Sequence, residues 1–120
     1  MNQYVDGFVL PLATDKIDVY REAATRAGEV WMDHGALAYW ETLSDDLSAG
    51  GCKSFIDCAD AKENESVVFA WVVYPSREDR DRIMAAVMVD PRLQCNENMP
   101  FDYTRMAYAG FKPLVTFNKN

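Results

Sequence analysis

The sequence predicts an α+β domain in which two helices cover one face of a four-stranded antiparallel sheet. Two observations carry this prediction. The segment Val67–Tyr74 is apolar throughout, as expected for a strand that is covered on both faces. The similar segments Phe8–Pro11 and Val72–Pro75 each end a strand pattern, and each is followed by a helical pattern. The chain therefore consists of two βαβ halves with the same layout.

The first half contains a strand, a helix and a second strand. Residues 4–12 are mainly apolar and form the first predicted strand. Over residues 15–34 the apolar side chains recur every three or four positions with charged ones between them, which is typical of an amphipathic helix. Gly35 follows, and glycine is common just after a helix end. A second strand is expected over 37–43.

The second half begins after a long polar connection, residues 44–66, and connections of this length are often functional or partly structured. Ser76, with Asp79 three residues later, is expected to cap the second helix. This helix is expected to end at Asp90, because the proline that follows disfavours helix before it. The alternating charges of Arg77–Arg82 indicate a solvated helix start.

The last strand is expected over residues 105–117. Gly110 within it suggests a bulge, and Pro113 suggests an edge position, because proline cannot donate a hydrogen bond to a sheet. Right-handed crossovers and non-crossing connections then favour the strand order 4-1-3-2. The predicted fold is α+β and ferredoxin-like, βαββαβ with an antiparallel sheet, in a single domain spanning residues 1–120.

One face of the predicted sheet has no cover within the chain. Two helices are enough for one face only, yet Val67–Tyr74 has the composition of a strand that is covered on both faces. A second copy of the chain is the simplest cover. We therefore expect a homodimer that forms through the sheet faces.

The composition limits the classes of partner. The chain has 120 residues, a net charge of −7 and a pI near 4.6. This acidity disfavours nucleic acids and anionic membranes, which bind basic surfaces. No segment approaches the ~20 apolar residues of a membrane-spanning helix, and the N-terminus does not resemble a signal peptide. The expected protein is cytoplasmic and binds neither nucleic acid nor membrane.

Cysteine usage predicts neither disulfides nor a metal site. The chain has three cysteines and no Cys-x-x-Cys, so a disulfide framework is not expected. The donors of a zinc site would be Cys52, Cys58, Cys95 and His34, the only histidine. Cys52 and Cys58 are spaced more widely than a usual ligand pair, and His34 lies far upstream. Free thiols, no metal and no cofactor are therefore predicted.

Asp6 and His34 are the candidate catalytic residues. His34 titrates near neutral pH, although a histidine at the end of a helix also interacts favourably with the helix dipole. Asp6 lies in an apolar strand, where an unpaired carboxylate is costly. It needs a partner such as Arg105, or it lines a wet cavity. Each residue thus has a structural and a catalytic interpretation, and access to a cavity distinguishes them.

Trp71, Arg105 and Tyr108 are candidate ligand-pocket residues. An arginine at a strand entrance can hold a carboxylate or phosphate through two hydrogen bonds, but Arg105 can equally pair with Asp102. Trp71 shares one strand face with Phe69. The alternative for Trp71 is a place in the core or in a dimer interface.

The chain resembles the DUF1428 (YbaA-like) family of small bacterial proteins over essentially the whole length of the chain. The segments that carry the resemblance are Tyr4–Val9, His34–Leu37, Val68–Arg77, Asp90–Arg92, Met99–Asp102 and Arg105–Met106. The resemblance implies a dimeric α/β barrel, in which two ferredoxin-like sheets face each other.

Proteins of similar fold include cofactor-free monooxygenases and isomerases that use the space between sheet and helices, which is an analogy at the level of fold. The expected function is therefore a dimer that binds a small molecule. A cofactor-free enzyme and a non-catalytic ligand-binding or regulatory dimer are the two forms of this expectation.

Overall fold

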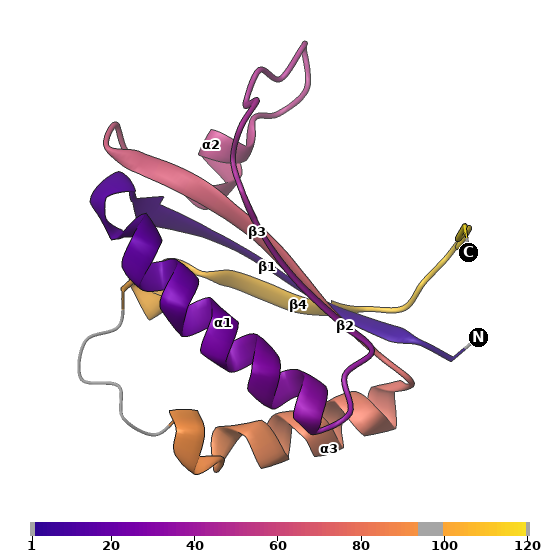
Figure 1. The fold of residues 1–120 in the computed structure, drawn as a ribbon. Helices are drawn as coiled ribbons and strands as arrows, with labels where there is room; N and C mark the ends of the chain where they lie inside the picture. Colours follow the sequence, from indigo (N-terminus) through magenta and orange to yellow (C-terminus); the bar gives the residue numbers. More distant parts are fainter. Residues whose placement is uncertain (1, 94–99, 120) are drawn as a thin grey trace.

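The structure is a computed structural model that describes residues 2–93 and 100–119 (Figure 1). In chain order its strands and α-helices are β1 (Tyr4–Ala13), α1 (Ile17–Asp33), β2 (Ala38–Leu43), α2 (Phe55–Ala59), β3 (Glu65–Tyr74), α3 (Arg77–Met88) and β4 (Ala107–Phe111). Short 3-10 turns lie at Thr14–Lys16, Pro91–Leu93 and Tyr103–Arg105. The order of the strands and of the two long helices, α1 and α3, confirms the predicted βαββαβ arrangement.

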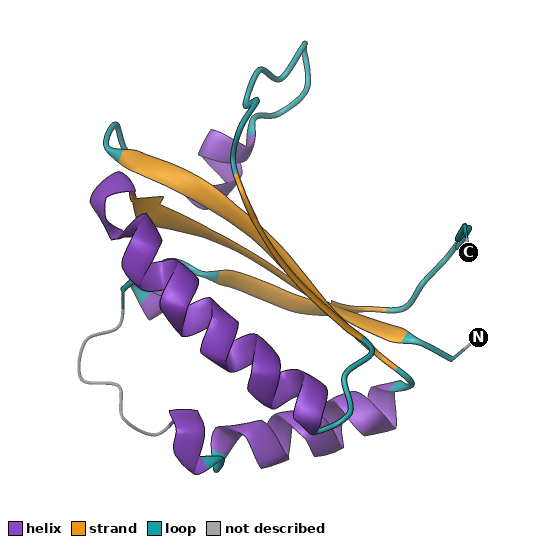
Figure 2. Ribbon diagram, in the orientation of Figure 1, coloured by secondary structure: helices purple, strands orange, loops and turns teal. Residues whose placement is uncertain are grey.

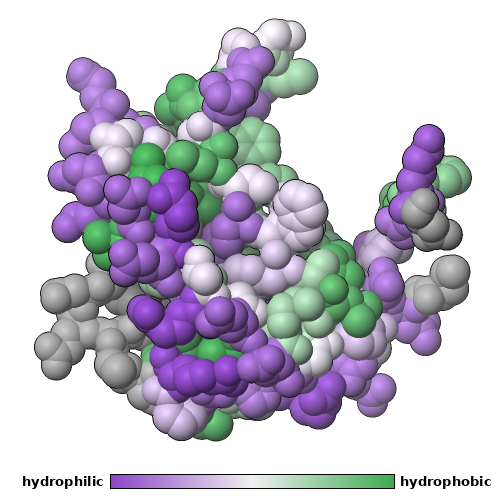
Figure 3. Space-filling model, viewed as in Figure 1, coloured by the Kyte–Doolittle hydropathy of each residue, from purple (hydrophilic) through white to green (hydrophobic). Residues whose placement is uncertain are grey.

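The strands form one antiparallel sheet in the order β2-β3-β1-β4. This is the predicted order, counted from the opposite edge. Helices α1 and α3 lie on the same side of the sheet (Figures 1 and 2), and the outward surface of α3 is mainly hydrophilic (Figure 3). The helices therefore cover one sheet face and leave the other open.

Strand β4 is an edge strand, but it is shorter than predicted. It ends at Phe111, two residues before Pro113, and Phe111 already pairs with the second residue of β1. The following residues have almost no part of β1 left to pair with. The predicted bulge at Gly110 is wrong, because Gly110 pairs with Asp6 in regular register. A Cβ at Gly110 would lie 2.7 Å from the ring of Tyr4, so the glycine leaves room for that ring.

The signals at the helix ends act as predicted. The Ser76 hydroxyl accepts a hydrogen bond from the amide three residues later, at 3.0 Å, and caps α3. At the end of α1 the His34 amide donates to a carbonyl of the last turn, and Gly35 adopts a φ of 118° that favours glycine. Helix α3 ends at Met88, two residues earlier than predicted, and Asp90 instead begins the next turn, where its side chain accepts a hydrogen bond from the Arg92 amide at 2.9 Å.

The core lies between the sheet and the two long helices. On β3 the alternate residues that face the helices are buried, namely Val68, Ala70, Val72 and Tyr74. The core also contains Leu10, Leu12, Val30, Ile83 and Val87. Burying one such aliphatic side chain contributes about 1.5–3 kcal/mol. This layer fixes the positions of α1 and α3 over the sheet.

Aromatic side chains line the open sheet face. Trp40 stacks on Trp71, with ring centroids 5.4 Å apart and planes 8° apart. Phe69 lies 5.4 Å from Trp71, and Phe55 of α2 meets Phe69 edge-on at 5.7 Å. We call these four residues the aromatic strip. Trp40 is 56% exposed and Phe69 is 43% exposed, so the apolar strand β3 is covered on one face only within a single chain.

Candidate functional site

A cavity of about 780 Å³ lies between α1 and the sheet. Its walls are mainly apolar and aromatic, and they include Phe8, Leu10, Ala27, Trp31, Ala70 and Val72. The small side chains of Ala27 and Ala70 leave space where the helix and the sheet would otherwise meet. Cavities of this size and lining are typical of small-molecule sites.

A hydrogen-bonded group of polar residues lies in this cavity, and we call it the Glu41 cluster. The hydroxyls of Tyr20 and Tyr39 donate to Oε1 and Oε2 of Glu41, each at 2.6 Å. Burial, followed by the charge of Glu41, raises the pKa of both tyrosines, so both remain hydrogen-bond donors. The same three residues also line a neighbouring cavity of about 780 Å³ between α1 and β2.

The sequence builds the Glu41 cluster from two elements. Tyr39 and Glu41 are two residues apart on β2, so both point to the helix face. Tyr20 comes from the first turns of α1. Gly28 of α1 lets the Tyr39 ring approach closely, because a Cβ at Gly28 would lie 2.9 Å from that ring. The carboxylate is therefore held in a fixed orientation by the two hydroxyls.

Asp6 is fully buried and has hydrogen-bond donors on both oxygens. Tyr74 Oη donates to Oδ2 at 2.9 Å, and Arg80 Nη1 donates to Oδ1 at 2.7 Å. Trp31 Nε1 in turn donates to Tyr74 Oη at 3.0 Å. Burial, followed by the charge of Asp6, raises the pKa of Tyr74. The ion-pair interpretation of Asp6 is confirmed, but Arg105 is the wrong partner, because Asp6 faces the helices and pairs with Arg80 of α3.

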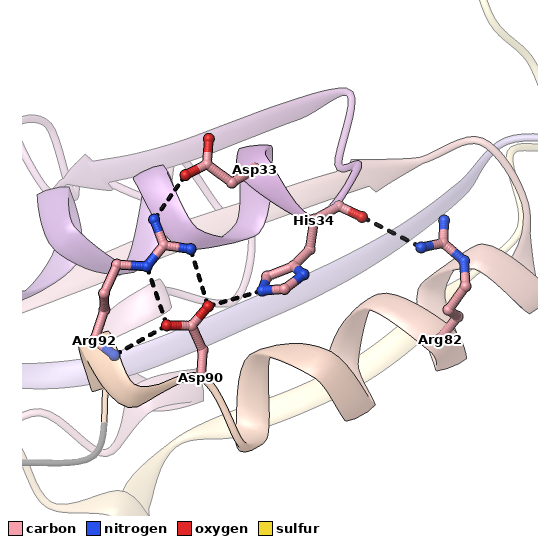
Figure 4. Close-up of polar contacts among 5 residues, drawn as sticks. All are labelled: Asp33, His34, Arg82, Asp90 and Arg92. Atoms are coloured by element: carbon pink, nitrogen blue, oxygen red, sulfur yellow. Dashed lines mark hydrogen bonds and ion pairs between the residues drawn. The ribbon is translucent and has the colours of Figure 1, made fainter.

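His34 lies at the C-terminal end of α1 in a cluster of charged residues (Figure 4). Its Nε2 is 2.8 Å from Asp90 Oδ2. Arg92 donates to Asp90 at 2.9 and 3.0 Å, and to Asp33 at 2.6 Å. The hydrogen bonds from Arg92, followed by the one with His34, hold the pKa of Asp90 well below its usual range. The cluster ties the end of α1 to the segment after α3.

The three predicted pocket residues lie in different places. Trp71 belongs to the aromatic strip on the open sheet face. Arg105 donates to the Glu65 carboxylate at 2.7 and 2.9 Å, so its ion-pair partner is not the aspartate three residues before it. Tyr108 accepts a hydrogen bond from Arg80 at 2.8 Å, and it thereby joins the network around Asp6.

Of the predicted site residues, the structure brings together only Asp6 and Tyr108, through Arg80. In the described ranges, the lining of the cavity includes none of the five predicted residues. Sequence reasoning missed the Glu41 cluster. Its signal in the sequence was Glu41, a charged residue in a predicted strand that otherwise resembles a core strand.

The sequence belongs to a defined family. The family described as "Protein of unknown function (DUF1428)" matches residues 3–103. A relative, the "Uncharacterized protein YbaA" of Escherichia coli K12, is 43% identical over 114 residues, which cover 94% of this chain and 97% of the relative. The chain belongs to the DUF1428 family. The resemblance found in the sequence is thereby confirmed.

Solved structures of similar fold extend the comparison. SnoaB of Streptomyces nogalater, described as a cofactor-independent oxygenase, has a TM-score of 0.57 and 12% identity, covering 99% of this chain and 100% of SnoaB. A dimeric ferredoxin-like protein from an uncultured marine organism has a TM-score of 0.55 and 13% identity, covering 98% of each chain. At these identities the similarity shows the ferredoxin-like fold alone.

Membrane-spanning helices and metal sites were sought in residues 2–93 and 100–119. No helix there has both the length and the apolar composition needed to cross a membrane, and the cytoplasmic location stays a prediction. No three His, Cys, Asp or Glu side chains in these ranges are grouped as metal ligands. Cys52 and Cys58 are free and exposed, whereas Cys95 lies outside the described residues.

Proposed function

We propose that this chain binds a small, mainly apolar molecule in the cavity between α1 and the sheet. The observation that carries the proposal is the cavity itself, with a volume of about 780 Å³ and aromatic and aliphatic walls around one polar cluster. Ligand sites commonly combine such walls with a few fixed polar groups. An empty apolar cavity also destabilises a fold, so an occupant would stabilise this one.

Binding without catalysis is the form of the proposal that the buried groups favour. A catalytic group must reach the reacting atoms. Asp6, one candidate acid or base, is 0% exposed, and both of its oxygens are already hydrogen-bonded. His34, the other candidate, contacts Asp90 and is not part of the cavity lining in the described residues.

A cofactor-free enzyme is the second candidate. The fold of SnoaB supports it by analogy, and Glu41 places one ionisable carboxylate inside the cavity. In this candidate Asp6 or His34 would act only after leaving its present partner, whereas Glu41 already faces the space that a substrate would occupy. Glu41 is also hydrogen-bonded on both oxygens, but it lines the cavity whereas Asp6 and His34 do not, so it is the more accessible group.

Titration with N-phenylnaphthylamine, a neutral apolar probe that fluoresces in apolar surroundings, tests the binding proposal. Wild-type protein is expected to bind the probe. Ala27→Trp fills the cavity from α1 and is expected to abolish binding. Ala85→Trp is the matched control, because Ala85 lies on an exposed position of α3 and the same substitution there leaves the cavity open. Equal binding by both variants, each folded by circular dichroism, would contradict the proposal.

We also propose that two copies pair through their open sheet faces. The aromatic strip exposes large apolar side chains there, and contiguous exposed apolar surface marks interaction sites. The segment after β4, the edge strand opposite β2, also exposes apolar side chains: Leu114, Val115 and Phe117 are 96%, 74% and 92% exposed. The similar marine protein is described as dimeric. Sedimentation velocity should give the mass of a dimer, and a monomer at micromolar concentration would contradict this pairing.

A further inference from the structure

We propose that the cavity binds an apolar organic amine in its protonated form, with the ammonium group on the carboxylate of Glu41. This inference rests on the proposed binding function and adds the chemical class of the ligand. Four features carry it: the free acceptor capacity of Glu41, its lack of an ion-pair partner, the aromatic walls around it and the charge of the whole chain.

The Glu41 carboxylate has capacity for further donors. An ionised carboxylate offers about four lone pairs. Tyr20 uses one on Oε1 and Tyr39 uses one on Oε2, each at 2.6 Å. The two tyrosines therefore orient the carboxylate while each oxygen keeps acceptor capacity. The N–H groups of an ammonium ion match this remaining capacity, because an ammonium donates hydrogen bonds and accepts none.

Glu41 has no cationic partner within the described ranges. The ion pairs found there join other carboxylates to Arg21, His34, Arg80, Arg82, Arg92 and Arg105. Glu41 is half-buried, and a carboxylate that is removed from water without a counter-charge is costly. A cationic ligand reduces this cost, whereas a neutral ligand of the same shape does not.

Aromatic rings line the same cavity as Glu41. The rings of Trp31 and Tyr39 lie 5.8 Å apart, and those of Tyr20 and Phe101 lie 5.7 Å apart. All four side chains line the cavity with Glu41. The faces of aromatic rings attract ammonium groups, and the same rings give the apolar body of an amine a surface to pack against.

The remaining charges of the cavity and of the chain also favour a cationic ligand. The net charge of −7 attracts cations and repels anions. The other charged residues of the lining, Glu22 and Arg26, lie on exposed positions of α1 and are four residues apart. At this spacing they are neighbours on the helix surface, and both side chains are exposed to solvent, whereas Glu41 is half-buried. Glu41 is therefore the charge that a buried ligand meets.

Isothermal titration with three ligands of one shape tests this inference: naphthylmethylamine, naphthylmethanol and naphthoate, at neutral pH. The amine is expected to bind at least about tenfold more tightly than the alcohol, since a charge-assisted hydrogen bond exceeds a neutral one. The carboxylate is expected to bind least. Glu41→Gln should abolish the preference for the amine and keep the affinity for the alcohol. Glu78→Gln, which removes the same charge from an exposed position of α3 outside the cavity lining, should keep the preference.

The outcomes separate this inference from the binding proposal. If amine and alcohol bind wild-type protein equally, the cavity still binds ligands but the amine assignment is overturned. The same holds if Glu41→Gln retains the preference. If none of the three ligands binds, the binding proposal falls and the amine assignment falls with it. The comparison of ligands on wild-type protein needs no variant, so a Glu41→Gln protein that fails to fold leaves the test intact.

Discussion

Removing the positive charge of Arg80 is expected to destabilise the fold more than removing the negative charge of its partner, Asp6. The Asp6 side chain is 0% exposed and that of Arg80 is 13% exposed. In Arg80→Met, Asp6 loses its ion pair and keeps hydrogen bonds from neutral groups only, among them the Tyr74 hydroxyl. In Asp6→Asn, by contrast, Arg80 keeps Asp81 and Tyr108, each at 2.8 Å.

The contacts of Asp6 and Arg80 determine the order in which the variants are expected to lose stability. Leaving a buried charge unpaired costs about 3–5 kcal/mol of unfolding free energy, and Arg80→Met should approach this range because Asp6 has no contact with water. Asp6→Asn weakens a hydrogen bond to a charged group and should cost about 1.5–3 kcal/mol. The double variant removes both charges and should be more stable than Arg80→Met alone. Arg82→Met is the matched control, since its pair with Asp79 is 60% exposed on the arginine side and should contribute at most about 1 kcal/mol.

Urea unfolding at neutral pH, followed by fluorescence and circular dichroism, measures these losses. All proteins are compared at one concentration, because the stability of a dimer depends on concentration. A loss for Arg80→Met no larger than that for Arg82→Met would refute the reasoning. Total stabilities are commonly about 5–15 kcal/mol, so Arg80→Met can fail to fold. In that case the double variant decides, since the reasoning requires it to recover a folded state.

Trp71→Asp is expected to give monomeric or insoluble protein in sedimentation velocity, because it puts an unpaired charge into the proposed dimer interface. A soluble dimer would show that the interface does not include Trp71. Hydrogen bonds, first from Arg105 and then from the backbone, lower the pKa of Glu65 to about 2. A carboxyl group with a lowered pKa stabilises the fold fully at pH values above its ordinary pKa, near 4.5 for Glu65. Glu65→Gln should therefore lose the most stability above pH 4.5, and this loss should vanish as the pH falls towards 2. A loss that stays constant over this pH range in urea unfolding would contradict the linkage. Gly28→Ala gains about 1 kcal/mol of helix propensity but loses about 1–3 kcal/mol because its Cβ crowds the Tyr39 ring. Thermal unfolding should therefore show no net gain in stability. A gain near 1 kcal/mol would mean that the ring moves aside freely.

The fold could be predicted because its signals are local. Alternation and helical periodicity locate the elements, Ser76 and Gly35 mark helix ends, and connection rules give the strand order. The extent of β4 could not be predicted in this way. Residues 112–117 have a composition that suits a strand, and only the register of β4 on β1 shows that β1 begins too late to pair with them.

The candidate site was less predictable, because its contacts join distant residues. Asp6 pairs with Arg80, 74 positions later. Arg80 belongs to the charge run Arg77–Arg82, for which a solvated surface was predicted. That prediction is wrong for Arg80. A helix that lies on a sheet has 3.6 residues per turn, so about one residue in each turn faces the sheet. The inward orientation of Glu41 likewise depends on the pairing of β2, which composition does not reveal.

The register of β2 on β3 gives neighbouring residues two different roles. Trp40 pairs with Trp71, and Glu41 pairs with Ala70. Because successive side chains of a strand point to opposite faces, Trp40 joins the aromatic strip while Glu41 enters the cavity, opposite a side chain small enough to leave space. A slip of one residue would exchange these faces. The proposed dimer and the proposed ligand site therefore depend on the same pairing but on different residues. Glu41→Gln should consequently remain dimeric in sedimentation velocity while losing its preference for amines, and a monomeric Glu41→Gln would show that the two faces are not independent.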